Sequence, residues 1–123
     1  MRFFALSMIG MALLLAAGCD AVNVKGTGTV TYSSGEPVPG GVIVFVTSTN
    51  QYTGEIVNGG FTLGGVRPGD GLPPGTYKVF ITGRDALDQP YVPNKYANVE
   101  TSELSFDVQK GSKNVFDVVV EKP

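Results

Sequence analysis

The chain has 123 residues, with 9 Lys or Arg, 11 Asp or Glu and no His, for a formal net charge of −2. Its charges are scattered, which argues against nucleic acid as a partner, because neutralising phosphates needs clustered Lys and Arg. Without His, a nucleophilic triad lacks its usual base and zinc lacks its commonest ligand. We therefore expect that this protein is not an enzyme and that it binds no metal ion and no cofactor.

The first eighteen residues have the layout of a secretory signal peptide. Arg2 gives the positive start, and residues 3–15 form a short apolar run that only Ser7 and Gly10 interrupt. The run is shorter than the roughly 20 apolar residues of a membrane-spanning helix. Cys19, the only cysteine in the chain, stands where cleavage would fall.

This layout resembles the signal peptide of bacterial lipoproteins, whose new N-terminal cysteine is acylated. Those signals usually place Leu, a small residue and then Gly or Ala before the cysteine, and Ala16-Ala17-Gly18 holds these places here. The resemblance implies lipidation at Cys19, with residues 19–23 as acylated cysteine and short tether. The protein would then be a membrane-anchored lipoprotein of the cell envelope, facing the periplasm or the cell exterior. Ordinary secretion with a free thiol is the alternative, and the choice of inner or outer membrane stays open.

The rest of the chain has the size of one domain, which we expect to span residues 24–123. Cleavage before Cys19 leaves 105 residues, enough for a core of its own. A single cysteine forms no internal disulfide, so packing alone has to stabilise this domain.

Alternation with a period of two predicts short β-strands along this domain. In chain order the expected strands are 21–32, 42–47, 52–56, 61–63, 76–82, 104–109 and 116–121. Gly26 and Gly28 inside the first strand predict a bulge or the close approach of another backbone. Asn58-Gly59-Gly60 predicts a hairpin. Residues 42–47 are apolar on both faces, which predicts either a covered second face or a surface for self-association.

Two long connections interrupt the strands. Residues 64–75 are rich in Gly and Pro, and residues 84–103 show little periodicity. Loops of this length are usually functional or poorly ordered, so both are candidates for binding a protein or polymer partner. Asp70, Asp85 and Asp88 offer oxygens to calcium, but no EF-hand pattern is present, and we expect solvated carboxylates.

About seven short strands, with no helical pattern after residue 19, predict an all-β fold, a seven-stranded Greek-key β-sandwich. Four segments carry recognisable motifs: Val24–Val30, Gly35–Phe45, Gly59–Leu63 and Pro73–Val79. In this order they resemble the carboxypeptidase regulatory-like domain. The resemblance implies a transthyretin-like, or prealbumin-like, sandwich with a non-catalytic role in packing or recognition. We also expect Gly35-Glu36-Pro37 to turn the first hairpin and Tyr77 to be a core aromatic with its hydroxyl at the rim.

Three residues of the second long loop give an alternative function, a carbohydrate-binding module. Tyr91 and Tyr96, with Arg84 nearby, are candidates for a surface that stacks on a sugar ring. The alternative is that both rings pack the loop against the sheet.

A covalent crosslink is a further possibility that the residue order raises. Lys25 on the first strand, Glu55 midway and Asn114 before the last strand resemble the crosslinking set of collagen-adhesin-type sandwiches. The alternation places Lys25 on the polar face, which is the wrong side for this chemistry.

Overall fold

The structure is a computed structural model that describes residues 23–64, 70–110 and 114–123. These residues form seven β-strands and one short 3-10 helix. The elements are β1 Gly26–Tyr32, β2 Val42–Val46, β3 Gln51–Glu55, β4 Gly60–Thr62, β5 Gly75–Thr82, η1 Asn94–Ala97, β6 Leu104–Val108 and β7 Asn114–Val120. The prediction of an all-β domain is confirmed. The expected signal peptide and Cys19 lie outside the described residues.

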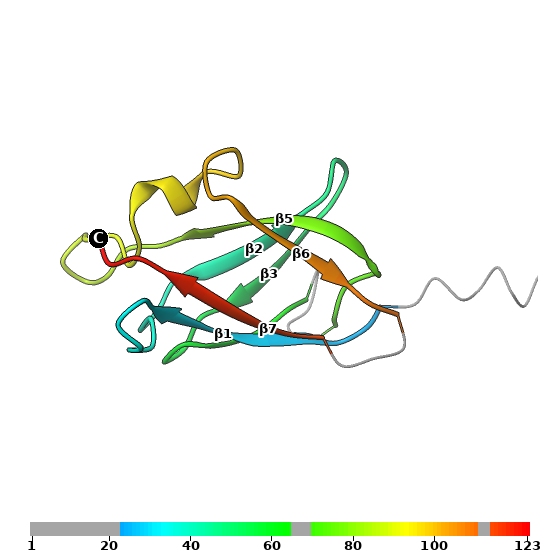
Figure 1. The fold of residues 1–123 in the computed structure, drawn as a ribbon, viewed down its shortest axis with the longest axis horizontal. Helices are drawn as coiled ribbons and strands as arrows, with labels where there is room; N and C mark the ends of the chain where they lie inside the picture. The colour runs from blue at the N-terminus through cyan, green and yellow to red at the C-terminus, as the bar shows by residue number, and fades with distance from the viewer. Residues whose placement is uncertain (1–22, 65–69, 111–113) are drawn as a thin grey trace, which may run out of the picture.

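The strands are divided between two sheets, as Figure 1 shows. One sheet has three strands in the order β4-β1-β7, and the other has four in the order β3-β2-β5-β6. The first and last strands pair in parallel, from Gly26 opposite Asn114 to Tyr32 opposite Val120. Every second residue of β7 is buried, which is the pattern of a strand with one face on a core.

Both sheets contribute to one hydrophobic core. Phe45 of β2 is fully buried at its centre. Its ring centroid lies 5.2 Å from that of Phe116, 5.9 Å from Phe106, 6.1 Å from Tyr77 and 6.5 Å from Phe61. Two of these partners belong to the other sheet, so their rings hold the sheets together.

Gly28 lies where two backbones come together, as the sequence predicts. A Cβ at this position would lie 2.2 Å from the carbonyl oxygen of Phe116 and 2.7 Å from the ring of Phe61. Only a residue without a side chain fits there. The predicted strand 21–32 begins later than expected, at Gly26, although Val24 still pairs with Leu72 through two backbone hydrogen bonds of 2.9 and 3.0 Å. Residues 21 and 22 lie outside the described residues.

The hairpin predicted at Asn58-Gly59-Gly60 is present. Asn58 and Gly59 have φ of 49° and 86°, and the amide and carbonyl of Val57 bond those of Gly60 at 2.9 and 3.0 Å. Left-handed conformations at both central residues are typical of a type I′ turn. The hairpin joins β3 to β4, which belong to different sheets, so the chain passes from one layer to the other here.

The first turn departs from the expectation of a simple hairpin at Gly35-Glu36-Pro37. The chain does reverse there, and the amide of Val38 donates to the carbonyl of Val30 at 2.9 Å. However, β1 and β2 lie in different sheets, so this return ends after one short bridge. The side chain of Val38 is fully buried, so it belongs to the core at the point where the chain passes towards the second sheet.

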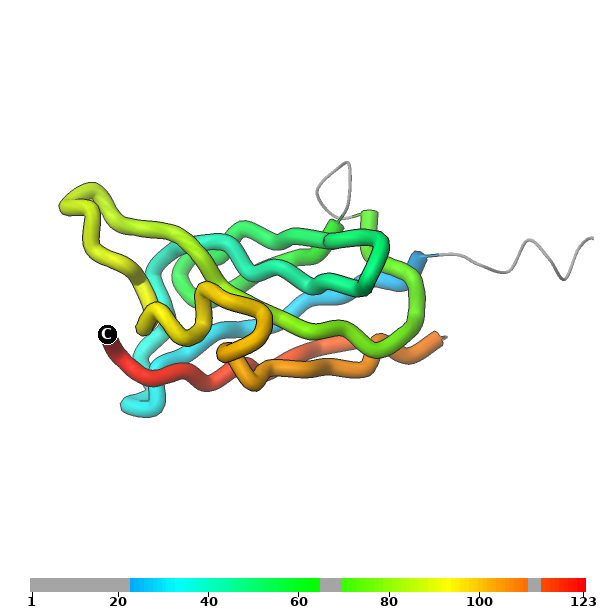
Figure 2. The backbone as a smooth tube through the Cα atoms, turned by 90° about the horizontal axis from the view of Figure 1, so that it is seen from above, coloured from blue at the N-terminus to red at the C-terminus, as the bar shows by residue number. Residues whose placement is uncertain are grey.

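The connections gather at two opposite ends of the sandwich (Figure 2). The N-terminal end consists of residues 23–25, 47–50, 70–74 and 109–110. The loop end consists of residues 33–41, 56–59, 83–97 and 121–123, and residues 98–103 run back along β5 to Leu104, which pairs with Val79. The strand registers fix this division, since Gly26 lies beside Asn114 at one end and Tyr32 beside Val120 at the other.

Candidate functional site

Residues 84–90 form a tight turn at the tip of the long loop. Asp85 Oδ1 accepts hydrogen bonds from the backbone amides of Leu87 at 2.8 Å and Gln89 at 3.0 Å. The guanidinium of Arg84 donates to the carbonyl of Asp88 at 2.7 Å. Arg84 therefore stabilises the turn from within. Leu87 is left 80% exposed at the tip.

Tyr91 packs this loop against the start of β2. Its ring lies so close to Gly40 that a Cβ there would be 2.9 Å away, and it also approaches Gly41 and Gly83. Its backbone carbonyl accepts a hydrogen bond of 2.6 Å from the hydroxyl of Tyr32. Tyr91 thus joins the loop to β1 through its carbonyl, and to the connection that precedes β2 through its half-buried ring.

Tyr96 lies in η1 and is only 6% exposed. Its hydroxyl accepts a hydrogen bond of 3.4 Å from the backbone amide of Glu121. The ammonium of Lys95 lies 5.0 Å from the ring centroid and 3.4 Å from the Glu121 carboxylate. A hydrogen bond to that carboxylate raises the pKa of Lys95 above its ordinary value.

These positions favour the packing interpretation of the two tyrosines over sugar stacking. A stacking platform needs an exposed ring face, and Tyr96 has none in this conformation. The structure does bring Arg84, Tyr91 and Tyr96 to the same end of the molecule, but each is engaged in holding the loop in place. The carbohydrate-binding prediction gains no support from this geometry.

Ser102 is a residue of this loop that sequence reasoning missed. It is 2% exposed, and its hydroxyl donates a short hydrogen bond to the carbonyl of Val79 in β5. The same oxygen accepts from the amide of Leu104 at 3.3 Å. A serine in a polar stretch carries no signal of burial. With Val92 and Tyr96 also buried, three side chains of this loop pack on the core.

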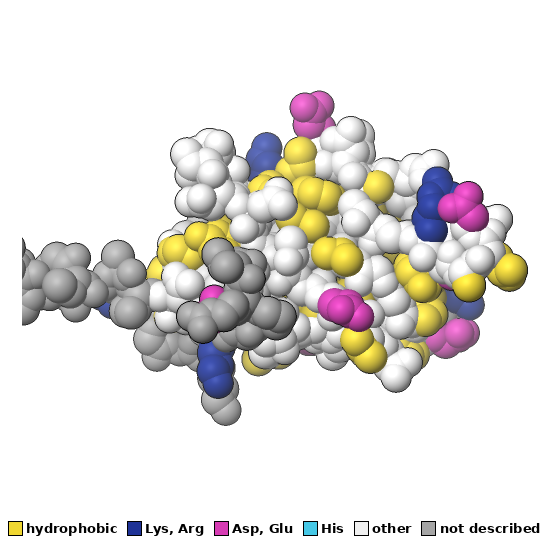
Figure 3. Space-filling model, turned by 180° about the vertical axis from the view of Figure 1, so that it is seen from behind, with side chains coloured by type: hydrophobic (Ala, Val, Ile, Leu, Met, Phe, Trp, Pro, Cys, Tyr) yellow, Lys and Arg dark blue, Asp and Glu magenta, His cyan; other side chains and the backbone are white. Residues whose placement is uncertain are grey.

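Ion pairs distinguish the loop end, where oppositely charged side chains stand side by side in Figure 3. Arg84 pairs with Asp88 at 3.8 Å, and Lys122 pairs with Glu36 at 3.2 Å. Lys122 also lies 5.6 Å from the ring centroid of Tyr32. Burial is the main cause that raises the pKa of this tyrosine, and the nearby ammonium of Lys122 opposes it.

The candidate crosslinking residues are not assembled for that reaction. Asn114 is 6% exposed, and its amide makes two hydrogen bonds to the backbone of Gln109, at 2.7 and 3.0 Å. Lys25 and Glu55 are both exposed, the second on a strand of the other sheet. Asn114 therefore closes the connection between β6 and β7, and no buried acid stands beside it in the described contacts.

The three carboxylates considered for calcium are also separated. Asp70 lies at the N-terminal end, whereas Asp85 and Asp88 lie at the loop end. In the part of the chain that the structure describes, no group of three or more His, Cys, Asp or Glu side chains is placed to hold a metal ion.

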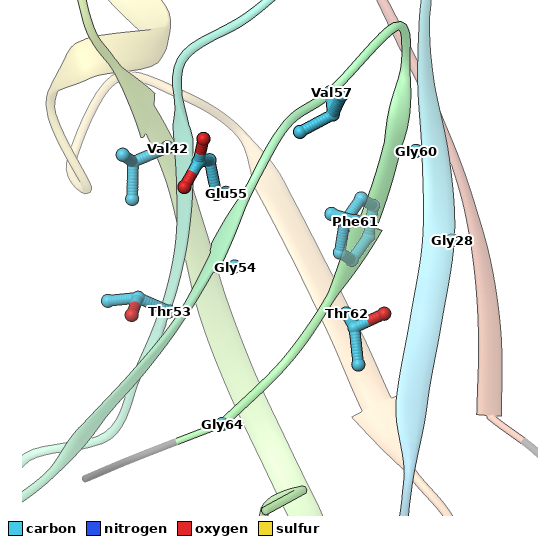
Figure 4. Close-up of a pocket in the computed structure, with 10 residues that line it drawn as sticks. All are labelled: Gly28, Val42, Thr53, Gly54, Glu55, Val57, Gly60, Phe61, Thr62 and Gly64. Carbon is cyan, nitrogen blue, oxygen red and sulfur yellow. The ribbon is translucent and has the colours of Figure 1, made fainter. Parts of the chain in front are cut away.

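An open groove of about 800 Å³ follows the corner where β3 passes into β4 (Figure 4). Its lining consists of Gly28, Val42, Thr53, Gly54, Glu55, Val57, Gly60, Phe61, Thr62 and Gly64. Backbone hydrogen bonds join its two sides, between Thr53 and Gly64 at 2.9 Å and between Val57 and Gly60. Glu55 is the one ionisable group among these residues.

The outer face of β2 is apolar, as the sequence indicates. Val42, Val44 and Val46 alternate with the core residues of the strand, so they lie on its other face. Val44 is only 5% exposed between its cross-strand neighbours Thr53 and Phe80. The side chains on either side of Val44 thus account for its burial. The prediction that this face of β2 mediates self-association stays untested.

These observations define an all-β protein in which two sheets enclose one hydrophobic core. Among residues 23–64, 70–110 and 114–123, no helix is long and apolar enough to cross a membrane. No protein-family model matches the chain, and no curated protein or solved structure matches it either.

Proposed function

We propose that this protein is a non-catalytic module of the cell envelope, anchored by acyl chains on Cys19. The domain would be a Greek-key sandwich of the transthyretin-like type, similar to carboxypeptidase regulatory-like domains, and would present its loop end to a protein or polymer partner. Support for the fold type comes from seven strands divided three and four between two sheets. Support for the anchor comes from the residues that surround Cys19 in the sequence.

The observation that carries the proposal is the opposite placement of the two ends. Residue 23 leads into the N-terminal end, and the loop 84–103 lies at the other. At about 3.4 Å per residue, the seven residues of β7 separate the ends by roughly 24 Å. A short tether from Cys19 would hold the first end at the bilayer and direct the second away from it.

This placement separates the two loops that the sequence offered as partner-binding candidates. The described part of the connection 64–75 lies at the N-terminal end, where Leu72 pairs with Val24. Only the loop 84–103 would face outward from an anchored domain. Because its hydrogen bonds and buried side chains hold it in one conformation, a partner would bind a surface that needs little ordering.

Intact mass spectrometry of the protein from the native membrane fraction tests the anchor. We expect cleavage before Cys19 and the added mass of acyl chains, since two or three chains bind a bilayer far more firmly than one. The matched control is Cys19→Ser, which removes the acyl acceptor and should abolish both the lipid mass and membrane retention. A cleaved chain without lipid, at an unchanged Cys19, would overturn the proposal of an anchored module.

A further inference from the structure

The cations of this domain are distributed differently at its two ends. Lys25 and Lys110 are exposed at the N-terminal end, and Lys78 is exposed on β5, level with the last residue of β2. Within the described residues, none of these three lysines forms an ion pair. At the loop end, in contrast, Arg84, Lys95 and Lys122 each pair with a carboxylate.

The carboxylates have the opposite distribution. The loop end and the strand end beside it carry five, against three cations, and these five are Glu36, Glu55, Asp85, Asp88 and Glu121. Three more lie nearer the middle of the long axis: Asp117 opposite Thr29, and Glu100 and Glu103 on either side of Ser102, which bonds to Val79 of β5. The described part of the N-terminal half has two carboxylates, Asp70 and Asp107, and the three lysines named above. The Asp107 carboxylate accepts a hydrogen bond of 2.7 Å from Thr76. The domain is therefore electrically polar along its long axis, and its loop end is acidic.

We infer that the exposed lysines of the N-terminal half, Lys25, Lys78 and Lys110, bind the anionic headgroups of the bilayer, and that this contact holds the domain upright. The inference rests on the proposed function, since the anchor is what brings this end to the membrane. Two features point to a lipid surface as the occupant. The chain leads from this end into the residues that precede it toward Cys19, and free ammonium groups complement negative headgroups.

The dimensions of the domain make the orientation selective. Charges in solution at physiological ionic strength are screened over about 8 Å, whereas the two ends are roughly 24 Å apart. In an upright domain Lys25 and Lys110 lie nearest the headgroups, Lys78 follows about 10 Å beyond the first residue of β5, and the acidic end lies outside the field. In a domain that lies flat, the surplus carboxylates approach the same negative surface and are repelled.

The test uses the acylated protein in vesicles, with a fluorescent label at one end or the other. Because Cys19 is the only cysteine and would carry the acyl chains, a label can be attached to a single introduced thiol. Asn50→Cys marks the N-terminal end and Leu87→Cys marks the loop end, and both positions are exposed. Energy transfer to an acceptor on the headgroups then reports the distance of each end from the bilayer.

We expect vesicles that contain phosphatidylglycerol to increase transfer from position 50 and not from position 87, relative to phosphatidylcholine alone. High salt should remove the increase. Reversing the three charges together, with Lys25→Glu, Lys78→Glu and Lys110→Glu, should also abolish it. The triple Lys→Arg variant keeps the charge and should retain it. Circular dichroism checks that each variant is folded.

The outcomes separate this inference from the proposed function. One contrary result is the same energy transfer from the acylated protein in both kinds of vesicle, and another is a triple Lys→Glu variant that responds like the parent. Either result overturns the contact between the lysines and the headgroups and leaves the anchor standing. If mass spectrometry finds no acyl chains on Cys19, the anchor is overturned, and this inference falls with it.

Discussion

Replacing Phe45 by Ala tests whether one aromatic cluster holds the two sheets together. Phe45 is fully buried and contacts four other aromatic rings, two of them in the opposite sheet. Truncating a buried Phe to Ala usually costs about 3–5 kcal/mol. Aromatic pairs add about 0.5–1.5 kcal/mol each beyond the area they bury, so we expect a loss in the upper part of this range.

A loss of this size is a large share of the roughly 5–15 kcal/mol that stabilises a typical domain. It should lower the melting temperature by roughly 15–30 °C. Equilibrium unfolding in guanidinium chloride, followed by far-ultraviolet circular dichroism, measures the free energy directly. Tyrosine fluorescence gives a second probe, because the chain has five Tyr and no Trp.

The matched control is Val115→Ala on β7. Val115 is 62% exposed, so its truncation should change the free energy of unfolding by less than about 0.5 kcal/mol. The reasoning is refuted if Phe45→Ala costs less than about 1.5 kcal/mol, or if both variants cost the same. Either result would mean that Phe45 is not at the centre of a packed interface between the sheets.

Three further changes probe other contacts by the same unfolding assay. Gly28→Ala should cost at least about 1–3 kcal/mol, because the new methyl group would overlap the backbone of Phe116, and a neutral result would show that the two strands separate easily. Asn114→Ala should cost about 1–3 kcal/mol by removing two hydrogen bonds to Gln109, and an unchanged midpoint would contradict that role. Burial raises the pKa of Tyr77 above its ordinary 10.0, so its phenol ionises first in the unfolded chain. Stability should therefore be unaffected by this group below about pH 10 and should fall as pH rises further. Tyr77→Phe should make that fall less steep, and a variant as sensitive to alkali as the parent would exclude the contribution.

The strands themselves were predictable because their signals are local. Residues 76–82 alternate between apolar and polar side chains, and in the structure Tyr77, Val79 and Ile81 are buried as expected. The hairpin at Asn58-Gly59 follows from the freedom of these two residues to adopt left-handed conformations. The close approach at Gly28 was indicated for the same kind of reason, since a glycine inside a strand has few other uses.

The candidate site was less predictable, because its roles depend on contacts between distant parts of the chain. Arg84, Tyr91 and Tyr96 were singled out by residue type, which does not reveal whether a ring is exposed. Tyr91 is tied to Tyr32, and Tyr96 to Glu121. Both bonds join positions that are far apart in the sequence, 59 residues for the first and 25 for the second.

By itself, the sequence determined an all-β domain of short strands and the positions of most turns. Only the tertiary structure decided which sheet each strand joins, that β1 and β7 run parallel, and that residues 70–74 and the tip of the loop 84–103 lie at opposite ends. The physical reason is the range of the interactions. Alternation and turn geometry are set within a few residues, whereas sheet membership, burial and the separation of charge are set by residues far apart in the chain.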